Sequence, residues 1–555
     1  MPRFDRQDLC EALRRLPEED LELALRTKIV PLVSLPGVKL YAACGPAALD
    51  LAHVRQLNVM AYAESGDLIA AARAVHGTAL LGEATRGLIR RQPEASASRR
   101  MTQAQVNCTL VLAGAAVTAS LLLPFQTVWS LASILSGMFF LGVVALRVLC
   151  LMPALPRRII RPPQLPDRVL PVYSVLVPLF RETSVLRQLL DALAQLDYPS
   201  QCLDIKLILE EEDILMQKAL AGIRLPPHFD VIVVPAGKPQ TKPRALNYAL
   251  QFCRGELLTI YDAEDQPEPD QLRKAAEYFA AASPDLACIQ AQLAFYNINE
   301  NWLTRNFTIE YAVLFGVLLP VLANHRLPLL LGGTSNHFRT RALRQVGAWD
   351  AYNVTEDADL GLRLARNGYD AATLDSVTYE EANTRLLNWM KQRARWLKGF
   401  LATWLVHMRS PRRFYREVGP AGFWVAQAMT LGVFASALLH PLCLVATVVI
   451  YAAYPVMPSG AGLFQVMIAG LNLFIFAAGY AVTIIASKRA LRLRGIRGWA
   501  GTLATMPVYW LLISCAAWYA LWQFAVAPFH WNKTEHGLSR QRPRRRRVAR
   551  RKVAS

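Results

Sequence analysis

The chain has 555 residues, 53% of them hydrophobic, and carries a formal net charge of +19 at pH 7. The apolar residues are concentrated in long blocks, which is not the pattern of a soluble globular protein. Arginine crowds beside these blocks, at 86–100, 157–161, 488–497 and 540–552, as in the cytoplasmic loops of membrane proteins. The charge therefore indicates attraction to anionic membrane lipids and no nucleic-acid binding, because no nucleic-acid-binding module accompanies it. The nine cysteines form no CxxC pair, which predicts reduced thiols and no zinc site.

The N-terminal part, residues 1–95, combines charged helical stretches with short β runs at Lys28–Ser34 and Val38–Ala43. This pattern predicts a small cytoplasmic α/β domain. Next come two segments without charge, Cys108–Phe125 and Val128–Ala145, each long enough to cross a bilayer. We interpret 107–152 as a transmembrane hairpin.

The segment 170–400 is mixed in composition and follows a linker rich in proline and arginine, Pro153–Pro171. A helix-like stretch at Ser184–Leu196 lies between β-like runs at Val172–Val177, Ile205–Leu209, Val231–Val234 and Leu257–Tyr261. Strands that alternate with helices predict a parallel α/β sheet.

The C-terminal part contains no Asp, Glu, Lys or Arg between Val418 and Ser487, which predicts membrane helices within 421–530. Three long apolar segments lie there, at about 421–454, 463–486 and 503–527, and the first can be one helix or two. Two further stretches, Tyr311–Asn324 and 401–417, have the composition of helices on a membrane surface. The tail at 538–555 is too rich in arginine to pack and is predicted to be disordered.

The positive-inside bias places both the loop Lys488–Arg497 and the basic tail in the cytoplasm. A single membrane crossing between the loop and the tail would place them on opposite sides of the membrane, so two alternatives stay open. Either Gly498–Asn532 is re-entrant and broken near Pro507, or the loop lies outside and 421–454 forms two helices. We favour the second, because an even number of spans keeps both chain ends inside.

Three groups of residues in the α/β segment carry chemistry. Asp262, Glu264 and Asp265 follow a β-like run, where open α/β sheets bind ligands. Glu356 and Asp357 precede a helical stretch, and Gln392, Arg395 and Trp396 share one helix face. Taken singly, these groups fit an acidic turn, a helix cap and an interfacial helix. Their order and spacing within one segment favour a common site.

The ordered set D-x-D, TED and Q-x-x-R-W resembles that of the processive family 2 glycosyltransferases, which include cellulose, chitin and hyaluronan synthases. Val177–Glu182 is similar to the first-strand motif of this family, Leu209–Glu211 to its second-strand motif, and Lys242–Asn247 to its K-x-x-A-L-N element. The strings DAEDQPEPDQL, GGTSNHF and PFHWNKTEHG look like those of bacterial transferases of the phage-adsorption-protein-B type.

This resemblance implies a GT-A-type (Rossmann-like) catalytic domain inserted between transmembrane helices of a bacterial inner-membrane protein. It implies inverting transfer of a sugar from a nucleotide-diphosphate sugar, of the UDP-sugar class, to a growing cell-surface polysaccharide. Export of such a product implies an outer-membrane export partner. Two alternatives stay open: transfer of a single sugar to a lipid carrier, and a catalytically degenerate membrane receptor or export subunit.

The resemblance also implies roles for individual residues. Asp357 is the general base, and Mg²⁺ or Mn²⁺ is held by Asp262 with either Glu264 or Asp265, because Glu264 stands where the family has Asp. The donor nucleotide is bound by Glu182, Glu210 or Glu211, Lys242, Asn247, Asp262 and Arg395. The acceptor is bound by Asn336, His337, Glu356, Gln392 and Trp396, although for His337 a structural, hydrogen-bonded role is favoured over a catalytic one.

The N-terminal 95 residues resemble the N-terminal domain of type II secretion ATPases at Ile29–Leu32 and Asp67–His76. Some of those domains bind cyclic-di-GMP, but this sequence does not show the nucleotide-binding repeats that would support such a partner. We therefore expect a docking or structural module.

Overall fold

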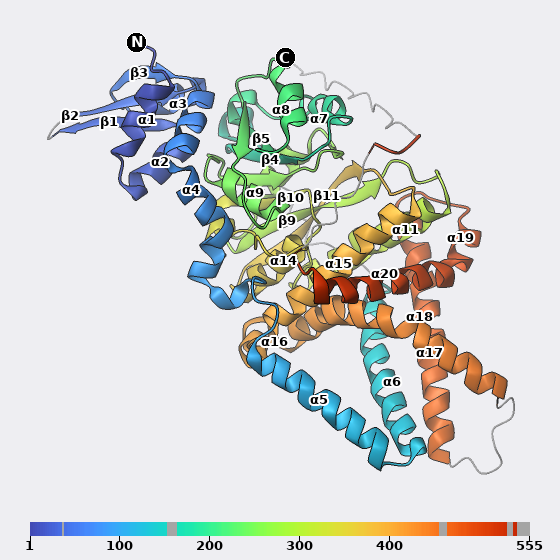
Figure 1. Cartoon of the computed structure of the whole chain (residues 1–555). Coiled ribbons are helices and arrows are strands. Elements are labelled where there is room, and N and C mark those ends of the chain that lie inside the picture. The colour runs from blue at the N-terminus through green and yellow to red at the C-terminus, as the bar shows by residue number, and fades with distance from the viewer. Residues whose placement is uncertain (36–37, 153–163, 454–462, 530–536, 541–555) are drawn as a thin grey trace.

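The computed structural model describes residues 1–35, 38–152, 164–453, 463–529 and 537–540. Figure 1 shows three parts: a small N-terminal domain, a central domain around a large sheet, and long helices that leave the central domain on one side. The predicted disorder of the tail falls, from residue 541 on, outside the described residues, as does most of the predicted linker.

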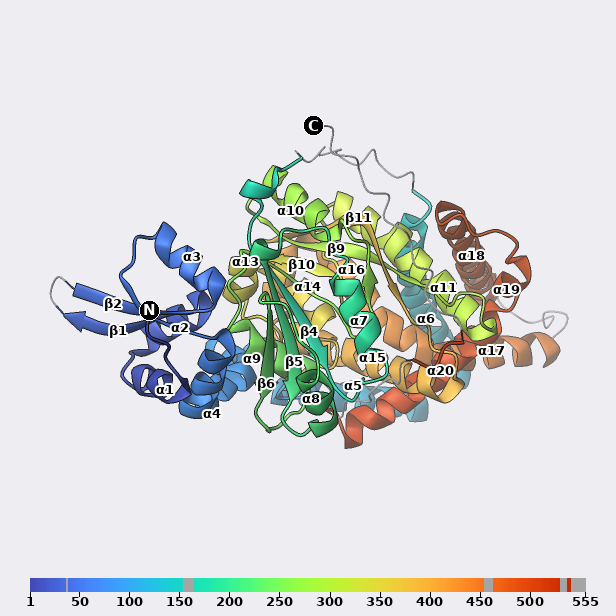
Figure 2. The same ribbon diagram turned by 90° about the horizontal axis from the view of Figure 1, so that it is seen from above.

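The N-terminal domain contains a three-stranded sheet of β1 (Ile29–Leu35), β2 (Val38–Cys44) and β3 (Val59–Ala63). β1 and β2 are antiparallel, and β2 and β3 are parallel. The domain's helices are α1 (Arg6–Arg14), α2 (Glu18–Thr27), α3 (Pro46–Val54) and the long α4 (Ser65–Arg91). Figure 2 shows α4 between this domain and the edge of the central sheet.

The central domain contains an eight-stranded sheet in the order β6-β5-β4-β7-β10-β9-β11-β8. Its parallel half consists of β4 (Tyr173–Leu179), β5 (Leu203–Glu210), β6 (Phe229–Val234) and β7 (Leu257–Ile260). The four predicted strands all lie in this half.

The other half of the sheet is mixed, so the prediction of a wholly parallel sheet is wrong. β10 (Asn336–Arg339) is antiparallel to β7 and to β9 (Leu286–Phe295), and β11 (Asp370–Glu380) is parallel to β9 but antiparallel to β8 (Gln266–Pro267). β8 and β10 have two and four residues, which is too short to show a period in the sequence.

The sheet is buried on both faces. Along β4, Tyr173, Val175 and Val177 face α7 (Leu186–Leu193) and α10 (Gln271–Ala281), whereas Leu176 packs on the side of α9 (Lys242–Leu250). This alternation is the two-residue period of a strand. Further helices of the domain are α8 (Ile214–Ala221), α13 (Thr340–Gln345) and α14 (Glu356–Arg366).

Six helical runs among the described residues are long and apolar enough to cross a membrane. They are α5 (Gln103–Leu122), α6 (Phe125–Leu149), α11 to α12 (Trp302–Val313 and Leu319–Asn324), α16 to α17 (Pro411–Gln427 and Val433–Ala453), α18 (Leu463–Leu493) and α20 (Met506–Val526). In Figure 1, α5, α6, α17 and α18 point away from the central domain, whereas α11, α20 and α15 (Leu386–His407) lie across its base.

The favoured arrangement of the C-terminal segment is wrong. The described part of this segment, 421–453, runs as one helix through a π-helical stretch at Ala428–Gly432 and does not form two antiparallel helices. The Arg494 guanidinium donates to the Leu293 carbonyl of β9 at 2.7 Å, and the amide of Gly537 donates to Glu381 at 2.7 Å. The basic loop and the start of the tail therefore both contact the central domain. They lie on one side because α20 runs along α15 and does not cross away from the domain.

Two predicted surface helices have different bounds in the structure. The stretch 401–417 is divided between α15 and α16, because the chain breaks before Pro411, which has no amide hydrogen to continue α15. Tyr311–Asn324 is the second half of a longer helical run from Trp302, most of which is buried in the protein.

A buried ion cluster attaches the N-terminal domain to the central sheet. Asp230 on β6 accepts from Lys28 at 2.6 Å, from Lys206 at 2.5 Å and from the Ser65 hydroxyl at 2.7 Å. Burial opposes ionisation of Asp230, but the two lysines outweigh it and hold the pKa of that carboxyl well below its usual range. Asp204 also accepts from Lys206, at 2.8 Å, and lies 3.6 Å from the Arg254 guanidinium.

We expect Asp230→Ala to lower the free energy of unfolding by about 3–5 kcal/mol, because the substitution leaves the buried Lys28 ammonium without its carboxylate. Thermal unfolding of the full chain in detergent measures the effect, with Asp50→Ala on the exposed side of α3 as the control. Equal unfolding midpoints for the two variants would contradict this account of the interface.

Candidate active site

A cavity of about 1,180 Å³ lies at the carboxyl ends of β4, β5 and β7, where it is closed by α9, α14 and α15. Open α/β sheets bind ligands at this end of their strands. Ten of the predicted site residues line it: Glu182, Glu210, Lys242, Asp262, Glu264, Glu356, Asp357, Gln392, Arg395 and Trp396.

Two short segments bring carboxylates into the cavity. Asp262 and Glu264 follow β7 directly, so the buried strand fixes their place. Asp357 is the second residue of α14, which packs closely against α15 at Gly399. A β-carbon on Gly399 would lie within van der Waals overlap of the Thr355 side chain, so only glycine allows this approach.

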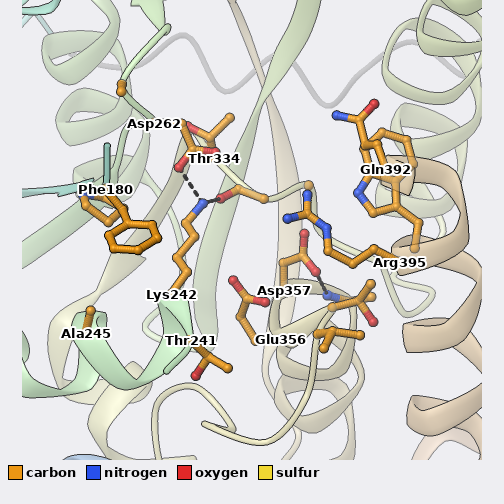
Figure 3. A pocket seen from close by; sticks show the side chains of 18 of the residues that line it. Phe180, Thr241, Lys242, Ala245, Asp262, Thr334, Glu356, Asp357, Gln392 and Arg395 are labelled. Atoms are coloured by element: carbon orange, nitrogen blue, oxygen red, sulfur yellow. Dashed lines mark hydrogen bonds and ion pairs between the residues drawn. The ribbon is translucent and has the colours of Figure 1, made fainter. Parts of the chain in front are cut away.

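Lys242 holds the acidic turn after β7. Its ammonium donates to Asp262 Oδ1 at 2.5 Å and to the Gly333 carbonyl at 2.8 Å, as Figure 3 shows. Burial alone would lower the pKa of Lys242, but Asp262 and Glu356 outweigh it and raise that pKa above its usual value. Lys242 therefore stays charged beside the acidic turn.

Asp357 has the environment of a general base. Burial raises its pKa above that of an ordinary carboxyl, although the Ala358 amide, which donates to Oδ1 at 2.7 Å, and Lys242 oppose the shift. Burial and the charge of Asp357 raise the pKa of the neighbouring Glu356 to about 8. Figure 3 shows Arg395 reaching from α15 toward Asp357. A carboxylate with a raised pKa is a stronger proton acceptor once it is ionised.

Negative charge accumulates on the other side of Lys242. Burial, and then the charges of Asp262 and Glu182, raise the pKa of Glu264 well above its usual value. Burial raises the pKa of Glu380 in the same way, with Asp265 and Glu264 as the next causes. These carboxylates repel one another, so a cation placed among them would be stabilised.

The acidic turn fits a hard divalent cation. Oxygen ligands are those that Mg²⁺ prefers, and Mg²⁺ is usually held by one or two carboxylates together with substrate phosphates. Asp262 and Glu264 supply such a pair. No group of three or more His, Cys, Asp or Glu side chains arranged to hold a metal occurs among the described residues.

Two of the predicted carboxylates do not reach the cavity lining. Asp265 is 1% exposed and turns into the protein, where Oδ2 accepts from the Asp262 amide at 2.7 Å and from the Thr334 hydroxyl. Asp265 therefore holds the acidic turn from inside the protein and does not line the cavity. Glu211 turns toward the N-terminal domain and pairs with Arg73.

Three predicted polar residues also lie outside the lining, because each one is used inside the fold. The Asn247 amide donates to the carbonyls of Ala84 and Trp349, and that of Asn336 donates to the Gly332 carbonyl. His337 Nδ1 lies 2.6 Å from the Tyr173 hydroxyl, and burial lowers the pKa of its imidazole to about 3. Burial therefore favours the neutral ring, and the structural role of His337 stays a prediction.

The structure adds two carboxylates that sequence reasoning missed. Glu212 lines the cavity beside Glu210, and Glu380 lines it from the end of β11. Glu212 is the third of three consecutive glutamates, so the sequence does not tell which of them faces inward. Glu380 belongs to a strand that was not predicted. Its nearness to the acidic turn depends on the pairing of β11 with β9 and β8.

Known proteins are similar in sequence to part of this chain. Residues 257–531 match the family model "Glycosyl transferase family group 2". The beta-monoglucosyldiacylglycerol synthase of Synechocystis sp. is 27% identical over 279 residues, which are 48% of this chain and 56% of that protein. Glucomannan 4-beta-mannosyltransferase 1 of Oryza sativa subsp. japonica is 26% identical over 222 residues, 39% of this chain and 42% of that protein. The chain spans about half the length of the curated relatives it matches.

Among solved structures, the mannosyltransferase PcManGT from Pyrobaculum calidifontis, in complex with GDP-Man and Mn²⁺, aligns with a TM-score of 0.47 at 17% identity. The alignment covers 72% of this chain and 98% of that chain. The family match begins at β7 and includes the acidic turn, the start of α14 and the face of α15 that carries Arg395. The segment 257–531 is therefore similar to the glycosyltransferases of family group 2, and the sheet to which this segment contributes is mixed.

Proposed function

We propose that the protein is an inverting, metal-dependent hexosyltransferase that moves a sugar from a nucleotide-diphosphate sugar, a UDP-sugar, to a growing cell-surface polysaccharide. The observation that carries this proposal is the meeting of Asp357, Arg395 and the Asp262–Glu264 turn in one cavity. A base, a cation for phosphate and carboxylates for a metal are the groups that such a transfer requires.

The reaction is a single displacement. The acceptor hydroxyl oxygen attacks the anomeric carbon, the bond from that carbon to the diphosphate oxygen breaks, and Asp357 receives the hydroxyl proton. Arg395 and Lys242 face the charge that develops on the leaving diphosphate, and the planar guanidinium of Arg395 suits phosphate oxygens. Asp262 and Glu264 would hold Mg²⁺ or Mn²⁺, which supplies further positive charge to the diphosphate when bound.

The donor and acceptor ends follow from the same geometry. Glu182, Glu210 and Glu212 line the end beyond the acidic turn, where the nucleoside of the donor would lie. Gln392 and Trp396 line the α15 side and would contact the acceptor sugar. Trp396 is already held in place, with its ring stacked 6.3 Å from that of Tyr311.

A lipid-linked acceptor is the second candidate, and a second cavity supports it. This cavity, of about 1,130 Å³, lies among α6, α17, α18 and α20, and Tyr311, Phe315 and Trp396 line both cavities. Its wall is largely apolar, as a hydrocarbon chain requires. The Synechocystis relative is named for a diacylglycerol product.

The proposal includes a place in the bacterial inner membrane with the central domain in the cytoplasm. The candidate spans α5, α6, α17 and α18 leave the central domain on one side, and the basic loop at Arg494 contacts that domain. Basic segments favour the cytoplasmic side of membranes. Export of the product rests on the motif resemblance alone.

We expect Asp357→Asn to lower the transfer rate by about 10²–10⁴, because the amide cannot accept the acceptor proton. Binding of the nucleotide diphosphate should change little, since the variant has the same size. A release assay for nucleotide diphosphate, with the purified chain in nanodiscs and a panel of sugar donors, measures the rate.

The pH profile provides the control for this assignment. The raised pKa of Asp357 predicts that kcat of the native chain falls with decreasing pH at values above those of an ordinary carboxyl, about 3.9. If Asp357→Asn turns over as fast as the native chain, Asp357 is not the base.

We expect Asp262→Ala and Glu264→Ala each to weaken donor binding in the presence of Mn²⁺, with a smaller effect in its absence. Asp265→Ala should instead lower thermal stability, because Asp265 accepts two hydrogen bonds inside the protein. Calorimetric titration of nucleotide diphosphate with and without Mn²⁺ measures the first effect. If Asp265→Ala loses Mn²⁺-dependent donor binding and Glu264→Ala does not, the metal ligand is Asp265 and not Glu264.

A further inference from the structure

We infer that the N-terminal domain is a working part of the donor site: through α4 it positions the cavity wall 236–241, with Arg73 as the positioning residue. This inference rests on the proposed function, because it concerns the end of the cavity assigned to the nucleotide. It gives the N-terminal domain, which lies outside the matched family segment 257–531, a role in substrate binding.

The wall concerned is the connection from β6 to α9. All six residues, Ala236 to Thr241, line the cavity opposite Phe180 and beside Glu212. It is a loop without regular secondary structure, so its conformation depends on what packs behind it. What packs behind it is α4 of the N-terminal domain.

The first contact is made through Glu211. One carboxylate oxygen of Glu211 accepts from the Ala236 amide at 2.9 Å, and the other accepts from the Arg73 guanidinium. Arg73 thus positions the Glu211 side chain. Glu211 in turn holds the amide of Ala236, the first residue of the wall. Both side chains are about a third exposed or more, so water screens this pair and its effect on binding is modest.

The second contact is made through Gly237. A β-carbon on this residue would lie 3.1 Å from Leu81 Cδ2 of α4, which means that Leu81 packs directly against the wall. Arg244 of α9 lies against the same residue, where its guanidinium donates to the Gly237 carbonyl and pairs with Glu210, which lines the cavity. Gly237 therefore contacts both the N-terminal domain, through Leu81, and Arg244, which is bonded to Glu210 at the donor end.

α4 is itself fixed to α9, so it can act as a support. The side-chain amides of Asn247 on α9 and of Gln251, the residue directly after this helix, both donate to main-chain carbonyls of α4, those of Ala84 and Leu80, each at 3.0 Å. The Lys28–Asp230 pair holds the same domain against β6, immediately before the wall. A shift of α4 would move these contacts together, and by thermodynamic reciprocity donor binding would stabilise the docked N-terminal domain.

The test compares Arg73→Ala with Arg90→Ala in the full chain. Arg90 is the matched control, because it lies on the same helix but pairs with Glu83 of that helix and not with the wall. Hydrogen exchange of peptides that cover 235–241 reports the loop without any substrate. We expect faster exchange in Arg73→Ala and native exchange in Arg90→Ala, with Arg73→Lys close to native.

Donor kinetics then test the link to binding. We expect Arg73→Ala to raise the donor KM by about twofold to fivefold with kcat nearly unchanged, which is the range for a partly exposed ion pair. Because Arg73 acts through Glu211, adding Arg73→Ala to Glu211→Ala should change neither exchange nor KM further.

The outcomes separate this inference from the proposed function. Native exchange at 235–241 in Arg73→Ala overturns the inference, whether or not a nucleotide sugar binds. An additive effect in the double variant overturns the path through Glu211. Faster exchange with an unchanged donor KM overturns the role of the wall in donor binding. A native chain that binds no nucleotide diphosphate at all contradicts the proposed function, and the exchange data still decide whether α4 supports the loop.

Discussion

Repulsion among buried carboxylates governs this cavity. Asp262, Glu264 and Glu380 converge on one side of Lys242, and Glu356 and Asp357 lie on the other. Burial raises the cost of each negative charge, so the group holds its charge only where cations approach it. The Lys242 ammonium donates a hydrogen bond to Asp262, and its charge also attracts the carboxylates of Glu356 and Asp357. In the proposed reaction, a divalent cation bound to the diphosphate would reduce its repulsion by these carboxylates.

Contacts of α15 with α11 and α20 fix the place of Arg395, the second cation of the site. Arg395 and Trp396 lie on α15, and the neighbouring Arg393 makes two bonds to Glu310 of α11, at 2.5 and 2.6 Å. The Tyr509 hydroxyl of α20 donates to the same carboxylate at 2.9 Å. This cluster thus ties three helices together below the cavity. The Arg393 side chain is 6% exposed, so removing Glu310 would leave a buried guanidinium without its carboxylate. The rotation of α15, and with it the direction of Arg395, is set by this cluster.

The sequence predicts the site residues whose position is determined by their neighbours along the chain. Asp262 and Glu264 follow a buried strand and Asp357 begins a helix, so local pattern locates them. Asn247 ends the K-x-x-A-L-N element, and Asn336 and His337 belong to the string GGTSNHF, yet their side chains enter the protein. A motif does not state which side of a strand or helix a residue faces. Glu380 shows the opposite failure: it reaches the cavity because β11 pairs with β9 and β8, which are distant in sequence. Long-range pairing of this kind leaves no local signal.

The conflict between the two basic segments shows how tertiary contacts override composition. The stretch from 503 to 527 is apolar and of spanning length, so counting hydrophobic residues makes it a crossing. Yet α20 carries Tyr509 and Trp510 toward polar partners, and Tyr509 is 2% exposed against Glu310 and Arg393. Such a helix satisfies its polar groups beneath the central domain and has no need to face lipid on all sides. The loop at Arg494 and the residues from Gly537 can then both contact the central domain, which one further crossing would forbid. Buried polar contacts, and not hydropathy, therefore decide that the residues from Gly537 to Arg540 contact the central domain that holds the candidate active site.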